Sequence, residues 1–243
     1  MLDVISIGHP TIDIYLDVPE AHMHTDEELQ REEVCLLWGQ KYYIHRLNTG
    51  VGGNALNVAV GLTQMDFNTV LVAGLGTDFY GNYAREILED FSVDLEYVQP
   101  TAKTDTSIVM NFRGDMTIFS YHADEAYTIP SDLMEQEARW VFLTSTGFST
   151  YTDLYAVVEE YLKRYPNAKL AMNPGPRELK EVKPTAALLP KTDLLIVNLE
   201  EATQLAEMEK LFHEDGLTEE QKVLELMRHF VDNGVSQSIN TNG

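Results

Sequence analysis

The chain has 243 residues, of which 17 are basic and 39 acidic, so its formal net charge is −22. Hydrophobic residues make up 44% of it, and no apolar run approaches the roughly 20 residues that cross a bilayer, which excludes disorder, collagen, coiled coil and a membrane-spanning helix. Because such a charge repels phosphate backbones and anionic lipids, the composition also argues against nucleic acid and membranes as partners.

The N-terminus and the cysteine count predict a cytoplasmic protein. Asp3 stands where a secretory signal peptide carries basic residues. Cys35 is the only cysteine, so no internal disulfide can form, and a reducing compartment is the simplest setting. Cys35 lies in an apolar stretch, which favours a core position over a catalytic one.

Hydrophobic periodicity predicts a chain in which strands alternate with helices. The expected strands span residues 4–7, 12–18, 69–75, 140–143, 169–172 and 193–197. The expected helices span residues 55–65, 83–91, 152–165 and 218–233, the last with Thr218 and Gln221 at capping-box spacing. Strands that are separated by helices form a parallel sheet with helices on both faces.

Some segments depart from this alternation. Residues 12–18 and a hairpin over 105–121 are expected to form a separate small β layer. The polar segment 20–33 predicts a short exposed helix, since Thr25 and Glu28 have capping-box spacing. The last strand, residues 235–240, is polar where a central parallel strand would be almost continuously apolar.

Three common site motifs are not matched. Gly76 and Gly81 have the spacing of a P-loop, but Asn82 and Tyr83 stand where Lys and Ser or Thr must reach the phosphates. Gly74-x-Gly76 lacks the third glycine of a dinucleotide-binding loop. His22-x-His24 has no evident second pair of ligands, which argues against a zinc site there.

The segment from Gly50 to Val60 indicates a ligand site. Gly52 and Gly53 allow a ligand to approach the backbone at a helix start, where free N–H groups point outward. Asn57 adds both a donor and an acceptor in the first turns. This arrangement suits a polyhydroxylated molecule; the alternative is a glycine-rich helix entry with a capping amide.

Several spaced motifs occur together along the chain: Gly8 followed by Asp13, Gly52-Gly53-x-x-x-Asn57-x-Ala59, Gly74-x-Gly76-x-Asp78-x-x-Gly81, Asn198-x-x-Glu201 and Thr241-x-Gly243. With these motifs the sequence resembles the ribokinase-like (PfkB) carbohydrate kinase family over essentially its whole length. The resemblance implies an α/β fold, a Rossmann-like three-layer parallel sheet with helices on both faces. It implies one domain over residues 1–243, with a small β-sheet lid drawn from about 11–47 and 105–121. Pairing of two lids into a homodimer is a further expectation.

The resemblance also implies a reaction and a set of site residues. The reaction is transfer of the ATP γ-phosphate, with Mg²⁺, to a hydroxyl of a small-molecule sugar or nucleoside. The positions that match the family's acceptor-binding residues are Asp13, Gly52, Gly53 and Asn57. Those that match its nucleotide-binding residues are Asn198, Thr241 and Gly243, and Glu201 matches the residue on the metal side.

Two departures from the family pattern affect the expected chemistry. Residues 173–177 read Asn-Pro-Gly-Pro-Arg where relatives carry Asp-Pro-Asn-x-Arg. The G-x-G-D signature, whose backbone forms an anion hole and whose Asp is the catalytic base, occurs nowhere in the 243 residues, so no catalytic residue is assigned. We therefore expect that the C-terminal part of the family fold is missing, that a sheet edge and an apolar face are left uncovered, and that this shortened chain does not turn over like a kinase. The alternative is a non-catalytic sugar-binding or regulatory protein.

Overall fold

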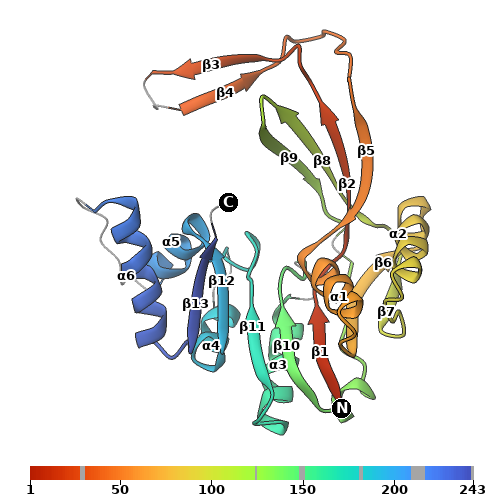
Figure 1. Cartoon of the computed structure of the whole chain (residues 1–243), viewed down its shortest axis with the longest axis vertical. Coiled ribbons are helices and arrows are strands. Elements are labelled where there is room, and N and C mark those ends of the chain that lie inside the picture. Colours follow the sequence, from red (N-terminus) through yellow and green to blue (C-terminus); the bar gives the residue numbers. More distant parts are fainter. Residues whose placement is uncertain (28–30, 124, 148–150, 181–182, 209–216, 242–243) are drawn as a thin grey trace.

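The computed structural model describes residues 1–27, 31–123, 125–147, 151–180, 183–208 and 217–241. Its centre is a seven-stranded sheet. The strands are β1 (Leu2–Ile7), β6 (Thr69–Gly76), β7 (Val98–Thr101), β10 (Ala138–Leu143), β11 (Lys169–Met172), β12 (Leu194–Asn198) and β13 (Gln237–Thr241). They lie in the order β13-β12-β11-β10-β1-β6-β7, and all neighbours run parallel. Figure 1 shows this sheet in the lower part of the molecule.

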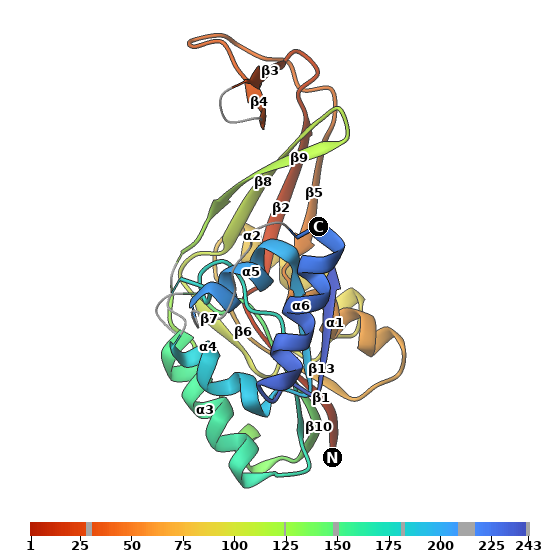
Figure 2. The ribbon, with the colours of Figure 1, turned by 90° about the vertical axis from the view of Figure 1, so that its left-hand side faces the viewer.

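Helices cover both faces of the sheet. The helices are α1 (Asn54–Gln64), α2 (Phe79–Asp90), α3 (Tyr151–Arg164), α4 (Lys183–Leu188), α5 (Leu199–Met208) and α6 (Glu219–Asp232), with 3₁₀ turns at Leu133–Glu135 and Leu189–Lys191. Helices α1 and α2 pack into one core cluster, whereas α3 to α6 pack into another, and Figure 2 shows α3 and α1 on opposite sides of the sheet. Within the described ranges no helix is both long enough and apolar enough to span a membrane.

Local sequence rules account for these elements. Strand β1 is buried along almost its whole length because helices cover both of its faces, as its apolar sequence predicts. Helix α6 begins with the expected capping box, in which the Thr218 side chain and the Gln221 side chain each accept from the other residue's backbone N–H. Its buried side chains, Leu226 and Phe230, are four residues apart and so share one face. The predicted parallel α/β fold is confirmed.

A second, smaller sheet stands above the first, as Figure 1 shows. We call it the small sheet; its strands are β2 (Thr11–Asp17), β5 (Leu47–Gly52), β8 (Asp105–Phe112) and β9 (Asp115–Tyr121), in the order β5-β2-β8-β9. Strands β8 and β9 are the predicted hairpin, turning at Arg113 and Gly114, both of which have positive φ. Strand β9 is exposed throughout, and its Ile118 and Phe119 are 58% and 55% exposed. The homodimer expected through this sheet stays a prediction.

The predicted helix over residues 20–33 is wrong. The chain forms an antiparallel pair instead, β3 (His22–Asp26) with β4 (Arg31–Cys35), while Glu28 of the expected capping box lies outside the described residues. The segment has no apolar stripe at helical spacing that a helix could bury, so strand pairing satisfies the backbone instead. The core position expected for Cys35 is also wrong, because Cys35 is exposed at the end of β4.

The polar sequence of the last strand is explained by its place in the sheet. In the described part of the chain, β13 pairs only with β12, and its residues are alternately exposed and half-buried. An edge strand tolerates polar residues that a central strand would not. Apolar side chains of β10, β11 and β12 line a groove of about 360 Å³ on one face of the sheet. Among the described residues, α1 is the only helix that lines this groove. Strand β13 is thus an open edge of the sheet in the described residues.

Asp78 joins the large sheet to the small sheet. It caps α2, because its Oδ1 accepts from the Gly81 N–H at 3.0 Å. The same carboxylate accepts from the Thr104 hydroxyl at 2.6 Å and from the Thr104 N–H at 3.2 Å, immediately before β8. A Cβ on Gly81 would lie 1.8 Å from the Gly76 carbonyl oxygen, so this turn requires glycine. The motif that includes these residues therefore has a structural role.

We predict that Asp78→Ala lowers the free energy of unfolding by about 2 kcal/mol at pH 7, because it leaves buried donors unpaired. Burial raises the pKa of Asp78, but the hydrogen bonds from Thr104 and Gly81 outweigh burial and hold the pKa below its ordinary value of 3.8. The stabilisation is therefore present above that pH and is lost as the pH falls through the folded-state pKa. Urea denaturation at several pH values measures it.

The control for this prediction is Asp90→Ala, at the exposed C-terminal end of the same helix. Asp90→Ala should change stability by less than about 0.5 kcal/mol. Equal losses in the two variants would contradict the structural role of Asp78.

Candidate functional site

The candidate site lies at one edge of the large sheet. Because all its strands are parallel, their carboxyl ends meet at the same edge, where ligands of open α/β sheets bind. Asn173 follows β11, and Asn198 and Thr241 end β12 and β13. Strand β1 ends at Ile7, and strand β2 of the small sheet begins at Thr11, three residues after Gly8. The small sheet therefore stands on the edge that carries these polar side chains.

Asp13, Gly52 and Gly53 come together beneath the small sheet. A Cβ on Gly52 would lie 2.1 Å from Asp13 Oδ2, and one on Gly53 would lie 2.5 Å from the His9 carbonyl oxygen. Gly53 has φ +99° and is the N-cap of α1, so this position needs glycine for its backbone conformation as well. Asp13 also accepts from the Thr11 hydroxyl at 3.1 Å. The structure thus places a half-buried carboxylate against bare backbone at a helix start.

Two asparagines of α1 differ in their surroundings. The side chain of Asn54 donates to Asn173 Oδ1 at 2.6 Å, and Asn173 in turn donates to the Ile196 carbonyl at 2.8 Å. This chain of contacts fixes the start of α1 against the ends of β11 and β12. Asn57 lies one turn further on, where its side chain is exposed and its N–H bonds to the Gly53 carbonyl at 2.9 Å. The sequence analysis selected Asn57 but missed Asn54.

Asn198 and Glu201 form a reciprocal pair at the start of α5. The Asn198 N–H donates to Glu201 Oε2 at 2.9 Å, and the Glu201 N–H donates to Asn198 Oδ1 at 2.8 Å. Burial raises the pKa of Glu201 above its ordinary value, against the effect of the Asn198 N–H. The N-x-x-E motif therefore caps a helix and leaves one carboxylate oxygen outside this pair.

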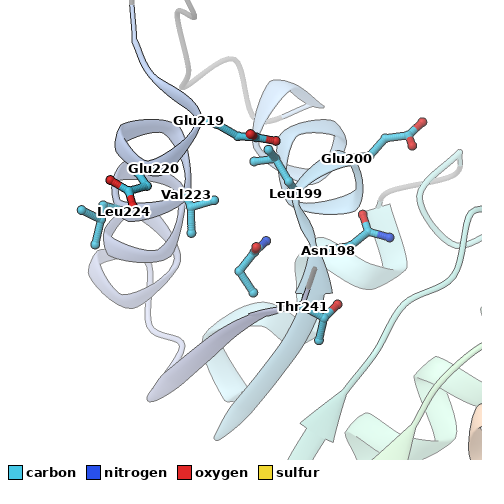
Figure 3. A pocket seen from close by; sticks show the side chains of 9 residues that line it. Asn198, Leu199, Glu200, Glu219, Glu220, Val223, Leu224 and Thr241 are labelled. Carbon is cyan, nitrogen blue, oxygen red and sulfur yellow. The ribbon is translucent and has the colours of Figure 1, made fainter. Parts of the chain in front are cut away.

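A large cavity of about 1010 Å³ opens between α5 and α6, above the ends of β12 and β13 (Figure 3). Asn198 and Thr241 line it together, as expected from their being register partners in the sheet. Glu201 does not line it, although Glu200 does, and Gly243 lies outside the described residues. The structure therefore brings together two of the three residues predicted to bind a nucleotide.

The cavity has an apolar part and a negative part. Leu199, Val223 and Leu224 form the apolar part, and Figure 3 shows Val223 facing the strand ends from α6. Glutamates supply the charge, namely Glu200, Glu219 and Glu220, and no Lys or Arg among the described residues lines the cavity. A bare polyphosphate would be repelled here, so an anionic ligand needs a bound cation.

His9, Asp105 and His122 also meet, at the base of the small sheet. The sequence analysis missed this cluster, because the three residues belong to segments that only the tertiary fold brings together. Burial lowers the pKa of His9 to about 4, although Asp105 opposes the effect. The only sequence signal was the position of His9 next to Gly8, in the first of the motifs.

The parallel sheet, the small sheet on its carboxyl edge and the two polar sites define a protein of the ribokinase-like fold. The sequence profile of the pfkB family carbohydrate kinases matches residues 1–243. The chain belongs to this family.

Individual relatives agree with this assignment. A ribokinase of Staphylococcus aureus (strain COL) is 23% identical over 247 residues, covering 99% of this chain and 72% of the relative. A nucleoside kinase of Methanothermobacter thermautotrophicus is 32% identical over 113 residues, 44% of this chain and 31% of the relative. The structure of the Arabidopsis thaliana ribokinase complexed with ribose and ATP superposes with a TM-score of 0.70 at 21% identity, covering 98% of this chain and 71% of that one. At this identity the superposition establishes the fold.

We predict that Gly53→Ala lowers the free energy of unfolding by at least about 2 kcal/mol, through its positive φ and its contact with the His9 carbonyl. Gly61→Ala is the matched control, since Gly61 lies in α1 with open space around its Cβ position. Alanine there should stabilise the helix by up to about 1 kcal/mol. Chemical denaturation separates the two variants, and effects of the same sign and size would refute the close packing at Gly53.

Proposed function

We propose that the chain binds a sugar or nucleoside through its hydroxyl groups beneath the small sheet and binds ATP with Mg²⁺ at the ends of β12 and β13. The reaction served by such a pair of sites is transfer of the γ-phosphate to an acceptor hydroxyl. The observation that carries the proposal is the close approach of the Asp13 carboxylate to the backbone of Gly52, near the carboxyl edge of the large sheet.

The chemistry of this contact favours a hydroxylated acceptor. An ionised carboxylate accepts hydrogen bonds from hydroxyls, and a charge-assisted bond of this kind is stronger than a neutral one. The Thr11 hydroxyl already donates to Asp13 Oδ1, which fixes the orientation of the carboxylate. Gly52 and Gly53 let the Asp13 carboxylate pack close to the start of α1, where free N–H groups can meet the oxygens of a sugar. The relatives named as ribokinase and nucleoside kinase support this class of acceptor.

The cavity between α5 and α6 suits a nucleotide that carries a cation. Its apolar side chains can contact a base, and Asn198 and Thr241 offer polar groups at the strand ends. The carboxylates around it are hard oxygen ligands of the kind that Mg²⁺ prefers. Glu201 does not line the cavity, so it would act on the cation through a water, by the oxygen that the Asn198 N–H does not occupy. Mg²⁺ bound there would neutralise charge on the phosphates.

Transfer requires more than binding. A general base contributes about 10²–10⁴-fold to a proton transfer of this kind. The 243 residues contain no G-x-G-D motif, and Asp13 and Glu201 are assigned to the acceptor and to the cation. The second candidate function is a sugar-binding or regulatory protein that binds the acceptor without transfer.

We predict that Asp13→Asn weakens binding of the acceptor by at least about 10-fold, because the neutral amide loses the charge-assisted hydrogen bonds and has one acceptor oxygen instead of two. Calorimetry with ribose and with adenosine measures this. The control is Asp17→Asn, in the same strand and on the same face, where the side chain accepts from Asn111 at 3.1 Å. Equal loss in both variants, or none in Asp13→Asn, would contradict the acceptor site.

A coupled assay with ATP, Mg²⁺ and the tightest-binding acceptor then separates the two candidate functions. We expect turnover at least about 10²-fold below 1 s⁻¹ in the chain of 243 residues. Turnover near 1 s⁻¹ that Asp13→Asn abolishes would show that a base lies among these residues and would exclude the non-catalytic alternative. Binding without turnover would support that alternative.

A further inference from the structure

Two histidines and an aspartate converge where the small sheet meets the large sheet. His9 lies between β1 and β2, Asp105 is the first residue of β8, and His122 follows β9 directly. One side-chain ligand atom from each of the three residues lies within 4.8 Å of the others. The cluster therefore combines one residue from the edge of the large sheet with two from the small sheet.

The contacts within the cluster are unequal. His122 Nδ1 and Asp105 Oδ2 are 2.6 Å apart, a hydrogen bond. His9 Nε2 is 3.7 Å from the same oxygen, which is beyond hydrogen-bond distance, and His9 Nδ1 is buried with no hydrogen-bond partner among the described residues. His9 Nε2 therefore lies near the carboxylate without a hydrogen bond to it.

The donor atoms suit metal coordination. Two imidazole nitrogens and a carboxylate oxygen lie within 4.8 Å of one another, and all three side chains are half-buried. Imidazole and carboxylate are side-chain groups that bind metals.

We propose that His9, Asp105 and His122 bind one Zn²⁺ ion, with water as the fourth ligand, and that the ion joins the base of the small sheet to the edge of the large sheet. Two nitrogens and one oxygen are a ligand set that zinc prefers, whereas Mg²⁺ and Ca²⁺ prefer oxygen alone. Tetrahedral bonds of roughly 2.1 Å place ligand atoms about 3.4 Å apart. The 3.7 Å separation of His9 Nε2 from Asp105 Oδ2 is close to this value, and the 2.6 Å between His122 Nδ1 and the same oxygen would lengthen by under about 1 Å.

A second set of metal-binding side chains, on the surface of the β3–β4 hairpin, could interfere with the test. His22 is opposite Cys35, and His24 is opposite Glu33, in the β3–β4 pair, so all four lie on one face of that hairpin. Among the described residues, His9, Asp105 and His122 bring three ligand atoms within 4.8 Å of one another, and these four do not. They could nevertheless chelate a metal at the surface. The experiment therefore uses a chain with His22→Ala and His24→Ala as its background.

The test is metal binding by this background chain, followed by Co²⁺ absorption and Zn²⁺ calorimetry. The proposal predicts one equivalent of Co²⁺ with the intense visible bands of a four-coordinate site, and displacement of Co²⁺ by Zn²⁺. Adding His9→Ala or His122→Ala should weaken Zn²⁺ binding by at least about 10²-fold. Adding His45→Ala, an exposed histidine outside the cluster, should leave it unchanged. Zn²⁺ should also raise the melting temperature of the background chain but not that of the His9→Ala variant.

Circular dichroism checks that each variant is folded. If His9→Ala does not fold, Asp105→Asn takes its place. Absence of four-coordinate Co²⁺ bands in the background chain would overturn the proposal. The proposal would also be overturned if the His9, His122 and Asp105 substitutions left the Zn²⁺ affinity within about twofold of that of the background chain. Binding that disappears on substitution of His22 and His24 alone would assign the metal to the surface hairpin and would also overturn it.

Discussion

The parallel direction of all seven strands in the large sheet is the constraint on which the candidate site depends. It brings the carboxyl ends of β1, β11, β12 and β13 to one edge, so residues as distant in sequence as His9 and Thr241 follow or end strands on the same side. The small sheet leaves the large one from this edge through β2, and Asp78 holds β8 to it by hydrogen bonds to Thr104. The strand topology and the Asp78 hydrogen bonds thus determine where the small sheet stands relative to the large sheet.

Charge and space divide this edge into two parts. Beneath the small sheet, glycines let the half-buried Asp13 carboxylate pack against the backbone at the start of α1. Between α5 and α6, glutamates surround apolar side chains without a lining Lys or Arg among the described residues. In the proposed function, the first part binds a neutral hydroxylated molecule directly, whereas the second binds an anion only together with a cation. The chemistry of phosphoryl transfer needs both kinds of ligand in one place, which is why the two parts are best explained together.

Much of the fold could be predicted because its signals are local. The capping box at Thr218 and Gln221 and the apolar strands β1 and β6 follow from residues close in sequence. The reciprocal pair of Asn198 and Glu201 follows from a four-residue motif, although its geometry as a helix cap needed the structure. The error over residues 20–33 has the opposite cause. A capping-box spacing without an apolar stripe is a weak helix signal, and the backbone pairing of β3 with β4 outweighed it.

The cluster of His9, Asp105 and His122 could not be predicted, since no local pattern links a residue after β1 with residues in and after a distant hairpin. The same limit applies to Asn54, whose partner Asn173 is 119 residues away. The sequence motifs select residues by type and spacing, so they found the glycines and Asp13. They could not show which polar groups the fold would bring to the same edge.

Hydrogen exchange read by mass spectrometry is the most direct test of the central claim, that the acceptor binds between the small sheet and the carboxyl edge of the large sheet. With saturating ribose or adenosine, whichever binds, we expect slower exchange in peptides covering residues 11–17 and 50–57, and unchanged exchange in those covering α3. Slower exchange confined to other regions, or none in either segment while calorimetry shows binding, would contradict the claim.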